Sequence, residues 1–318
     1  MAESLPSKQM TRVRIPIGAF KMKKETFKKN FTEFHDKNYK KLLVVPAILM
    51  LFCVGYLFFF YQQNGDFFYK DISLSGGTSV TIDGEINSNN LQDTISSQLE
   101  NVNVREISDL ITQKTIAVIV ETTSDEKITR TVLENFLGYE LNEENSSFEF
   151  TGSTLSENFY QQLLIALLIA FVLMAIVVFI QFRSFVPSFA VIFSAFADIV
   201  MSLVLVNILG IKISSAGIVA LVMLIGYSVD TDILLTNKVL KRDRDSLNKK
   251  IFSSFSTGLT MTLTSLFAVI VANFVVGQFS SILGQIFLIM AIGLSFDILN
   301  TWVTNVSIIK WYAIKKRK

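Results

Sequence analysis

Residues 213–236 read ISSAGIVALVMLIGYSVDTDILLT, an apolar run that is interrupted by two aspartates near its end. About 20 apolar residues are enough for a helix to cross a bilayer, so this run predicts a transmembrane helix. Asp230 and Asp232 then lie inside the membrane or close to it. A carboxylate at the centre of a bilayer costs at least about 2.5–3.5 kcal/mol, and residues that carry this cost usually serve the transport of protons, ions or charged substrates.

The rest of the chain repeats this pattern. Of its 318 residues, 51% are hydrophobic, which is typical of a membrane protein. We expect six transmembrane helices, at 42–61, 159–181, 186–209, 213–236, 253–276 and 282–306. Two more aspartates, Asp198 and Asp297, fall inside these runs. No removable signal peptide is expected, because the first apolar run begins near Leu42 and is long enough to span.

Basic residues gather in alternate loops, which places those loops in the cytoplasm by the positive-inside rule. They are Lys21, Lys23, Lys24, Lys28, Lys29, Lys37, Lys40, Lys41, Arg183, Lys238, Lys241, Arg242, Arg244, Lys249, Lys250, Lys315, Lys316, Arg317 and Lys318. We therefore expect a multi-pass protein of the cell membrane, with a basic N-terminal segment at 1–41 and a basic tail at 310–318, both cytoplasmic. The long acidic segment 62–157 then lies outside, and residues 158–309 form a bundle of five helices.

The outside segment shows the periodicities of a small folded domain. Alternating β-branched and apolar residues predict strands at 78–83, 102–107, 115–121 and 147–151. Helices are expected to begin at Ser88 and Ser124. Their apolar faces are Leu91, Ile95 and Leu99 in the first helix, and Ile128, Val132 and Phe136 in the second. The order βαββαβ indicates a ferredoxin-like α+β domain between the first two transmembrane helices, with a loose acidic loop as the alternative.

Small and polar residues surround the membrane aspartates. Asp198 follows Ser194 and precedes Ser202 at four-residue spacing, and the same holds for Asp297 with Gly293 and Thr301. The run 253–276 is rich in hydroxyl groups, which suit close helix packing as well as a wet path. The candidates for a proton or ion path are Asp230, Asp198, Asp297 and Asp232.

Asp230 and Asp232 cannot both face one crevice. Two residues on an ideal helix are separated by about 200°. We expect Asp230 to be the buried one, because it lies deeper and follows Gly226, and Asp232 to lie near cytoplasmic water. No Lys, Arg or His lies within the spanning runs away from their ends, so a cationic partner would come from another subunit.

The sequence shows no motif for a disulfide, a metal site or ATP binding. One cysteine, Cys53, cannot form an intrachain disulfide, and one histidine, His35, has no neighbouring ligands for a metal. A glycine-rich phosphate loop is absent, which argues against ATP use. We expect that the protein binds no cofactor, no metal and no nucleic acid.

Two segments resemble the SecF family of protein-export membrane proteins. One is the run Gly226, Tyr227 and Ser228 with the aspartates that follow it. The other is DISLSGGT at 71–78, similar to the Asp-Φ-x-Gly-Gly entry to that family's outer domain, with Asp71, Gly76 and Gly77 in the matching places. The resemblance covers about residues 30–310. Many bacterial members have Gly-Tyr-Ser-Φ-Asn-Asp-Thr, so Asp230 and Thr231 stand at the Asn and Asp positions, as in the archaeal branch.

The resemblance implies a function and partners. It implies an accessory subunit of Sec protein export, not an enzyme, with an architecture like that of resistance-nodulation-division transporters. Its partners would be a SecD-like subunit with a similar six-helix half, the Sec translocon, the translocating polypeptide and the surrounding membrane lipid. Bacterial members draw on proton flow. The alternatives are a half-transporter for lipids or hydrophobic compounds and an intramembrane aspartyl protease, although the Gly-x-Gly-Asp pattern of such proteases is missing.

Overall fold

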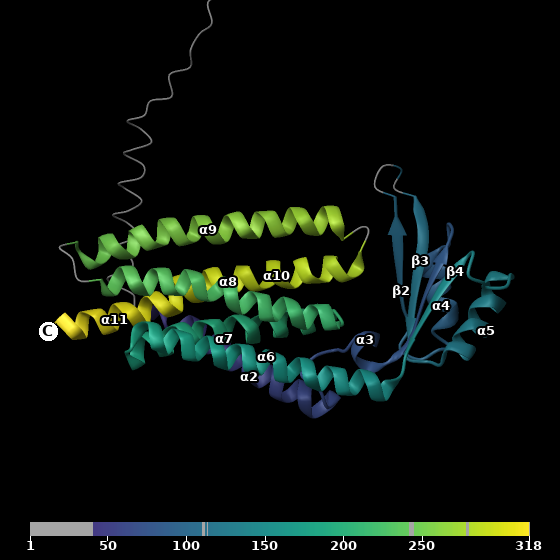
Figure 1. The fold of residues 1–318 in the computed structure, drawn as a ribbon, viewed down its shortest axis with the longest axis horizontal. Helices are drawn as coiled ribbons and strands as arrows, with labels where there is room; N and C mark the ends of the chain where they lie inside the picture. Colours follow the sequence, from purple (N-terminus) through teal and green to yellow (C-terminus); the bar gives the residue numbers. More distant parts are fainter. Residues whose placement is uncertain (1–40, 110–111, 113, 242–244, 278–279, 318) are drawn as a thin grey trace, which may run out of the picture. The chain divides into compact units, whose positions relative to one another are not determined.

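The computed structural model describes residues 41–109, 112, 114–241, 245–277 and 280–317 (Figure 1). Within these residues, six helical segments are long and apolar enough to cross a membrane. The basic residues expected at 1–40, Arg242, Arg244 and Lys318, together with His35, lie outside the described part of the chain. The chain is therefore a multi-pass α-helical membrane protein.

The six spans confirm the six apolar runs. The first five are α2 (Val44–Asn64), α6 (Ser153–Phe182), α7 (Phe185–Ile208), α8 (Ser215–Leu240) and α9 (Leu247–Val276). The sixth is continuous from α10 (Ser281–Leu299) through the π-helix η1 (Asn300–Asn305) to α11 (Val306–Arg317). The helix thus continues beyond 306, the expected end of the last span. Lys310, the first residue of the expected basic tail, lies within α11 and is 2% exposed.

Helices α7 and α8 form the centre of the bundle. They are the most buried of the six spans, whereas α6 and α9 are mostly exposed on their lipid-facing sides. Helix α8 contacts α6, α7, α9 and α10. Side chains on α7 and α8 therefore have the fewest routes to solvent, which matters for the aspartates that they carry.

Between α2 and α6 lies a small antiparallel sheet, reached through the short helix α3 (Ile72–Ser75). Its strands are β1 (Gly77–Asp83), β2 (Asn103–Ser108), β3 (Thr115–Thr122) and β4 (Ser146–Thr151), in the order β2-β3-β1-β4. The helices α4 (Ser88–Ile95) and α5 (Glu126–Leu137) pack against one face of the sheet (Figure 1). The four expected strands and two expected helices are all present.

The sheet domain has its own apolar core. Val80, Ile82 and Val120 on the strands pack against Ile95 on α4 and Leu133 on α5. Alternate strand residues point to the other face, so Ser79 and Thr81 lie on the face without helices. One expectation fails here: Ile128 is 55% exposed. On α5 the buried stripe runs through Thr129 and Leu133 instead, one position further along the chain.

Candidate functional site

Three aspartates from three helices are buried in the centre of the bundle. Asp198 on α7, Asp232 on α8 and Asp297 on α10 are each 0% exposed. Each lies on a stripe of its helix that faces the neighbouring helices. The buried stripe of α8 has three- and four-residue spacing, which is the helical repeat; its members are Leu221, Ile225, Ser228, Asp232, Leu235 and Val239.

Asp198 receives two hydrogen bonds from other helices. The Ser228 hydroxyl donates to its Oδ2 at 2.5 Å, and the Asn300 amide donates to its Oδ1 at 2.7 Å. One turn further along α7, the Ser202 hydroxyl donates to the Asp198 carbonyl oxygen at 2.6 Å. The bonds from Ser228 and Asn300 link α7 to α8 and to η1 around one carboxyl group.

A single hydroxyl joins the other two carboxylates. Thr301 Oγ1 lies 2.8 Å from Asp232 Oδ1 and 3.1 Å from Asp297 Oδ1. Asn305 Nδ2 donates to the same oxygen of Asp232 at 2.6 Å, and the Thr262 hydroxyl of α9 lies 3.5 Å from Asp297 Oδ2. Since a hydroxyl carries one proton, Thr301 can donate to only one of the two carboxyl groups.

The π-helix η1 supplies most of the polar ligands of this cluster. Its Asn300, Thr301, Thr304 and Asn305 are all buried. In a π-helix, residues five apart align, so Asn300 and Asn305 lie on one side of the segment. Single-turn π segments inside α-helices often occur at functional sites. Asn305 was not among the expected site residues, although it continues the four-residue spacing of Asp297 and Thr301.

The carboxylate cluster holds no partner cation among the described residues. In that part of the chain, none of the three carboxylates forms an ion pair with a Lys, Arg or His side chain. Nor does any group of three His, Cys, Asp or Glu side chains there have the arrangement of a metal site. Hydroxyl and amide groups alone therefore solvate the three carboxyl groups.

Asp230 lies outside this cluster, which corrects the expectation that it is the buried member of its pair. It is exposed on the outer face of α8, together with Val219, Met223 and Tyr227 at helical spacing. The physical reason is the phase of the helix: Ser228 and Asp232 are one turn apart on the buried stripe, and α8 continues to Leu240. Asp232 is therefore buried in the bundle about two turns before the end of the helix.

The glycine pair where the chain enters β1 has a backbone conformation that suits glycine. Gly76 and Gly77 have φ angles of 81° and 142°, which L-residues with a side chain rarely adopt. A Cβ on Gly76 would lie 2.6 Å from Cα of Ser153, at the start of α6. Gly226, in contrast, has open space around it within this chain and sits on the exposed face of α8.

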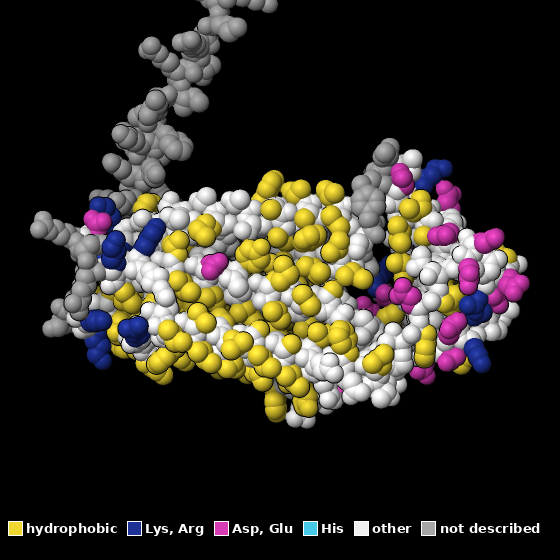
Figure 2. All heavy atoms as spheres, viewed as in Figure 1, with side chains coloured by type: hydrophobic (Ala, Val, Ile, Leu, Met, Phe, Trp, Pro, Cys, Tyr) yellow, Lys and Arg dark blue, Asp and Glu magenta, His cyan; other side chains and the backbone are white. Residues whose placement is uncertain are grey.

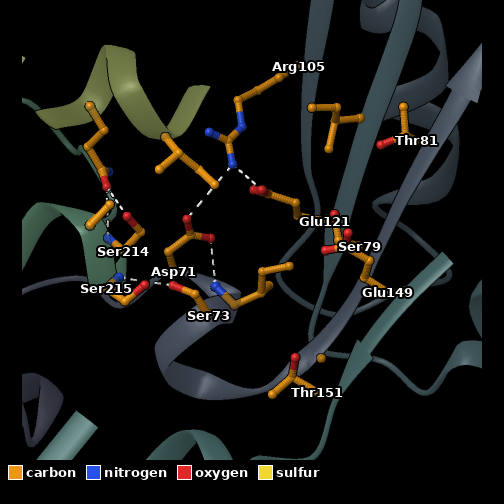
Figure 3. A pocket seen from close by; sticks show the side chains of 16 residues that line it. Asp71, Ser73, Ser79, Thr81, Arg105, Glu121, Glu149, Thr151, Ser214 and Ser215 are labelled. Atoms are coloured by element: carbon orange, nitrogen blue, oxygen red, sulfur yellow. Dashed lines mark hydrogen bonds and ion pairs between the residues drawn. The ribbon is translucent and has the colours of Figure 1, made fainter. Parts of the chain in front are cut away.

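Asp71 belongs to a second polar cluster, at the base of the sheet. It caps α3 by accepting a hydrogen bond from the Ile72 amide at 2.6 Å. Arg105 of β2 points between two carboxylates: it pairs with Glu121 of β3, and its Nη2 lies 3.8 Å from Asp71 Oδ2 (Figure 3). Asn103 also donates to Glu121, at 2.9 Å. Arg105 thus ties the sheet to the segment that follows α2.

The charges in this cluster affect one another. Burial, and then the charge of Glu121, raise the pKa of Asp71, and the nearby Arg105 only partly opposes them. For Arg105, burial disfavours the cation, but its hydrogen bond with Glu121 and the two carboxylate charges outweigh this effect and raise its pKa. The guanidinium therefore stays charged, and Asp71 is the group whose charge responds to pH.

A cavity of about 300 Å³ lies beside this cluster, between the helix-free face of the sheet and the ends of α8 and α10. Ser79, Glu149 and Thr151 line it from the sheet, and Ser214 and Gln285 from the bundle (Figure 3). The segment before α3 is bonded to the loop between α7 and α8: the Asp71 amide donates to the Ile213 carbonyl at 3.0 Å. Ser73 also accepts from the Ser215 amide at 3.1 Å. Neither Arg105 nor Glu121 was expected as a site residue, because their partners in this cluster are distant along the chain.

Comparison with known proteins identifies the family. The family model described as "Protein export membrane protein SecD/SecF, C-terminal" matches residues 131–315. The protein-export membrane protein SecF of Methanocaldococcus jannaschii is 36% identical over 287 residues, which is 88% of this chain and 98% of that protein. The SecF proteins of Methanolacinia petrolearia and Pyrococcus furiosus are 34% and 32% identical, over 88% and 87% of this chain and 95% and 92% of their own lengths.

Solved structures share the fold. A crystal structure of SecDF, a translocon-associated membrane protein from Thermus thermophilus, superposes with a TM-score of 0.67 at 18% identity. The match covers 89% of this chain but 38% of that one. SecDF in a super-membrane-facing form gives a TM-score of 0.57 at 17% identity, over 88% of this chain and 39% of the other. With relatives this similar over nearly its whole length, the chain belongs to the SecF family of protein-export membrane proteins.

Proposed function

We propose that this chain is an accessory, non-enzymatic subunit of Sec protein export and that proton flow through its buried carboxylate cluster assists the movement of unfolded polypeptides out of the cell. The family supports the export role, and its relatives carry that name. This family assignment disfavours the half-transporter for small hydrophobic compounds. The observation that carries the proton proposal is the cluster of Asp198, Asp232 and Asp297, buried without a cation among the described residues.

The bridge through Thr301 suggests how a proton is held. Its hydroxyl donates to one carboxyl group and can accept from the other only if that group is protonated. One proton shared over Asp232, Thr301 and Asp297 satisfies both contacts, at 2.8 and 3.1 Å. Losing this proton leaves like charges close together in an apolar bundle, which is unfavourable. Proton uptake and release would therefore change the contacts of α8 with α10 and η1.

The exposed face of α8 suggests where a partner binds. A carboxylate facing lipid is unfavourable, and Asp230 lies on such a face with Tyr227 and Gly226. The SecDF chain of known structure is more than twice as long as the part that this chain matches. We propose that a SecD-like subunit covers this face and contributes a cation near Asp230. Contacts with the translocon and with the translocating polypeptide belong to the same proposal.

The charge distribution supports one orientation. Between residues 66 and 152 there are 16 Asp and Glu against 5 Lys and Arg. At the other end of the bundle Lys and Arg gather around the end of α11 (Figure 2). We propose a ferredoxin-like extracytoplasmic domain at 62–157, cytoplasmic segments at 1–41 and 310–318, and spans at 42–61 and within 158–309. The Asp71 cluster would then transmit movements of the bundle to this domain.

Two experiments test this function. Deleting the gene should slow the export of secreted proteins, and the wild-type chain should restore it; normal export without the gene would refute the export role. Purification from the native membrane in a mild detergent should recover a second polytopic protein, and Asp230→Lys should reduce its recovery. Full activity of the isolated monomer in vesicles would refute the partner proposal.

A further inference from the structure

An apolar groove lies at the end of the bundle that carries α11. It has a volume of about 330 Å³ and lies where the residues before α2 and the start of α7 meet α11. All six of its lining side chains are apolar: Leu43, Phe185, Val186, Phe189, Ile308 and Trp311. The groove is separate from the carboxylate cluster, because it shares none of the side chains described there.

The groove opens outward from the bundle. Phe185, Phe189 and Trp311 are 73%, 50% and 42% exposed, respectively. The rings of Phe185 and Phe189 are stacked with centroids 6.1 Å apart, so they form one continuous wall. An exposed apolar groove on a soluble protein indicates a protein partner, but on a transmembrane bundle the surrounding solvent is lipid. A hydrocarbon chain has the shape and polarity to fill this groove.

Three exposed basic residues lie within four residues of lining residues along the chain, on three separate segments, and are called here the rim of the groove. Lys41 and Arg183 are exposed and come two residues before the lining residues Leu43 and Phe185. Lys315 on α11 is exposed, and its Nζ lies 5.4 Å from the centroid of the Trp311 ring. No Asp or Glu occurs at 41–64, 158–197 or 298–317, the stretches that build the groove and its rim. Within these stretches, therefore, no carboxylate is available to pair with the basic residues of the rim, which favours an anionic ligand.

We propose that the groove is a binding site for one anionic membrane lipid. A hydrocarbon chain of the lipid lies between Phe189 and Trp311, and its phosphate headgroup is held by Lys41, Arg183 and Lys315. Trp at the membrane interface commonly places its ring at headgroup level, which fits Trp311 beside Lys315. The charge of the rim selects an anionic lipid over a zwitterionic one. This site goes beyond the proposed export function and does not depend on it.

The chain contains its own reporter for this site. It has two tryptophans, and Trp302 is buried beside Phe255, so Trp302→Phe leaves Trp311 as the only tryptophan. We would reconstitute this variant in vesicles with a small fraction of either brominated phosphatidylglycerol or brominated phosphatidylcholine. Bromine quenches tryptophan fluorescence only at close range. We expect stronger quenching by the anionic lipid at equal mole fraction, and we expect high salt to weaken the preference.

Variants of the rim test the charge directly. Each basic side chain near an anionic membrane surface contributes about fivefold in affinity. Arg183→Gln with Lys315→Gln should therefore lower the preference for phosphatidylglycerol by at least about tenfold. Lys127→Gln is the matched control, because Lys127 is an exposed cation on α5 of the sheet domain. It should leave the preference unchanged.

Two outcomes would overturn the proposal. Equal quenching by the two lipids would show that the groove contacts lipid without a preference for the anionic headgroup. Absence of quenching by either lipid would show that protein covers the groove, either a second copy or another subunit. If Trp302→Phe does not fold, native mass spectrometry of the wild-type chain gives the same test. It should show one retained phosphatidylglycerol that the double variant loses, and retention by the double variant would refute the site.

Discussion

The core of the sheet domain allows a prediction with a matched control. Ile95 on α4 is 0% exposed and packs in the core with the strands, whereas Ile128 on α5 is 55% exposed. Truncation of a buried Ile to Ala usually costs about 2–5 kcal/mol, and a surface truncation stays within about 0.5 kcal/mol. The domain has about 75 residues, from Gly77 to Thr151. At about 0.05–0.15 kcal/mol per residue, its whole stability is about 4–11 kcal/mol.

Ile95→Ala should therefore remove about half of the stability, and Ile128→Ala almost none. In a domain of this size, 1 kcal/mol lowers Tm by about 4–8 °C, so the loss of about 2–5 kcal/mol in Ile95→Ala should lower Tm by about 8–40 °C. The assay is a thermal melt, followed by circular dichroism, of a soluble fragment spanning 66–156. Equal melting of Ile95→Ala and the wild type would refute the assignment of the core, as would an equally large loss in Ile128→Ala. A wild-type fragment without a cooperative melt would refute an independently folding domain.

Three further predictions follow from the clusters described above. Because burial, and then the charge of Glu121, raise the pKa of Asp71, its contribution to stability is full below the ordinary Asp pKa of about 4 and is lost as pH rises through the raised value. The Tm of the whole protein in detergent should therefore fall as pH rises through this range, and it should fall less in Asp71→Asn. An equal pH dependence of Tm in the two proteins would contradict this prediction. Gly77→Ala should lower Tm more than Gly84→Ala, because both glycines have positive φ but only Gly77 is crowded by neighbouring backbone. Thr301→Val should impair export while Thr301→Ser retains it, and normal export with Val would exclude the hydroxyl bridge.

The sequence was sufficient for every element with a strong local pattern. The six apolar runs correspond to six spans, and the four alternating segments correspond to four strands. Both are predictable because a continuous apolar run and an apolar alternation are patterns of neighbouring residues. Helix starts were less accurate. Asn87 and Asp125 cap the two domain helices, each one residue away from the expected Ser88 and Ser124, since neighbouring polar residues compete for the same backbone amides.

The sequence predicted which aspartates are candidates for the site, but not which of them are buried together. Asp198 and Asp297 are buried, as their small and polar neighbours indicated, whereas Asp232, which joins them, was expected near cytoplasmic water. The expectation that Asp230 is the buried residue is wrong, because Ser228 and Asp232 share the helical phase that faces the bundle. The π-helix at Asn300–Asn305 was not expected from the sequence.

Contacts between distant segments had no sequence signal at all. Arg105 and Glu121 appear as ordinary strand residues until the fold brings them to Asp71. The bond between the Asp71 amide and the Ile213 carbonyl joins residues that are far apart in the chain. Such contacts depend on the packing of the sheet domain against the bundle, which no local periodicity encodes.

The most direct test of the account compares Asp232→Asn with Asp230→Asn. Both changes remove one charge from α8 at nearly constant volume, but only Asp232 is buried in the carboxylate cluster. Complexes purified with matched amounts of the partner subunit are reconstituted in vesicles, a pH gradient is imposed, and proton entry is followed with a pH-sensitive dye. We predict that Asp232→Asn abolishes proton entry and that Asp230→Asn retains it. Proton entry at the wild-type rate in Asp232→Asn, or its loss only in Asp230→Asn, would contradict the account.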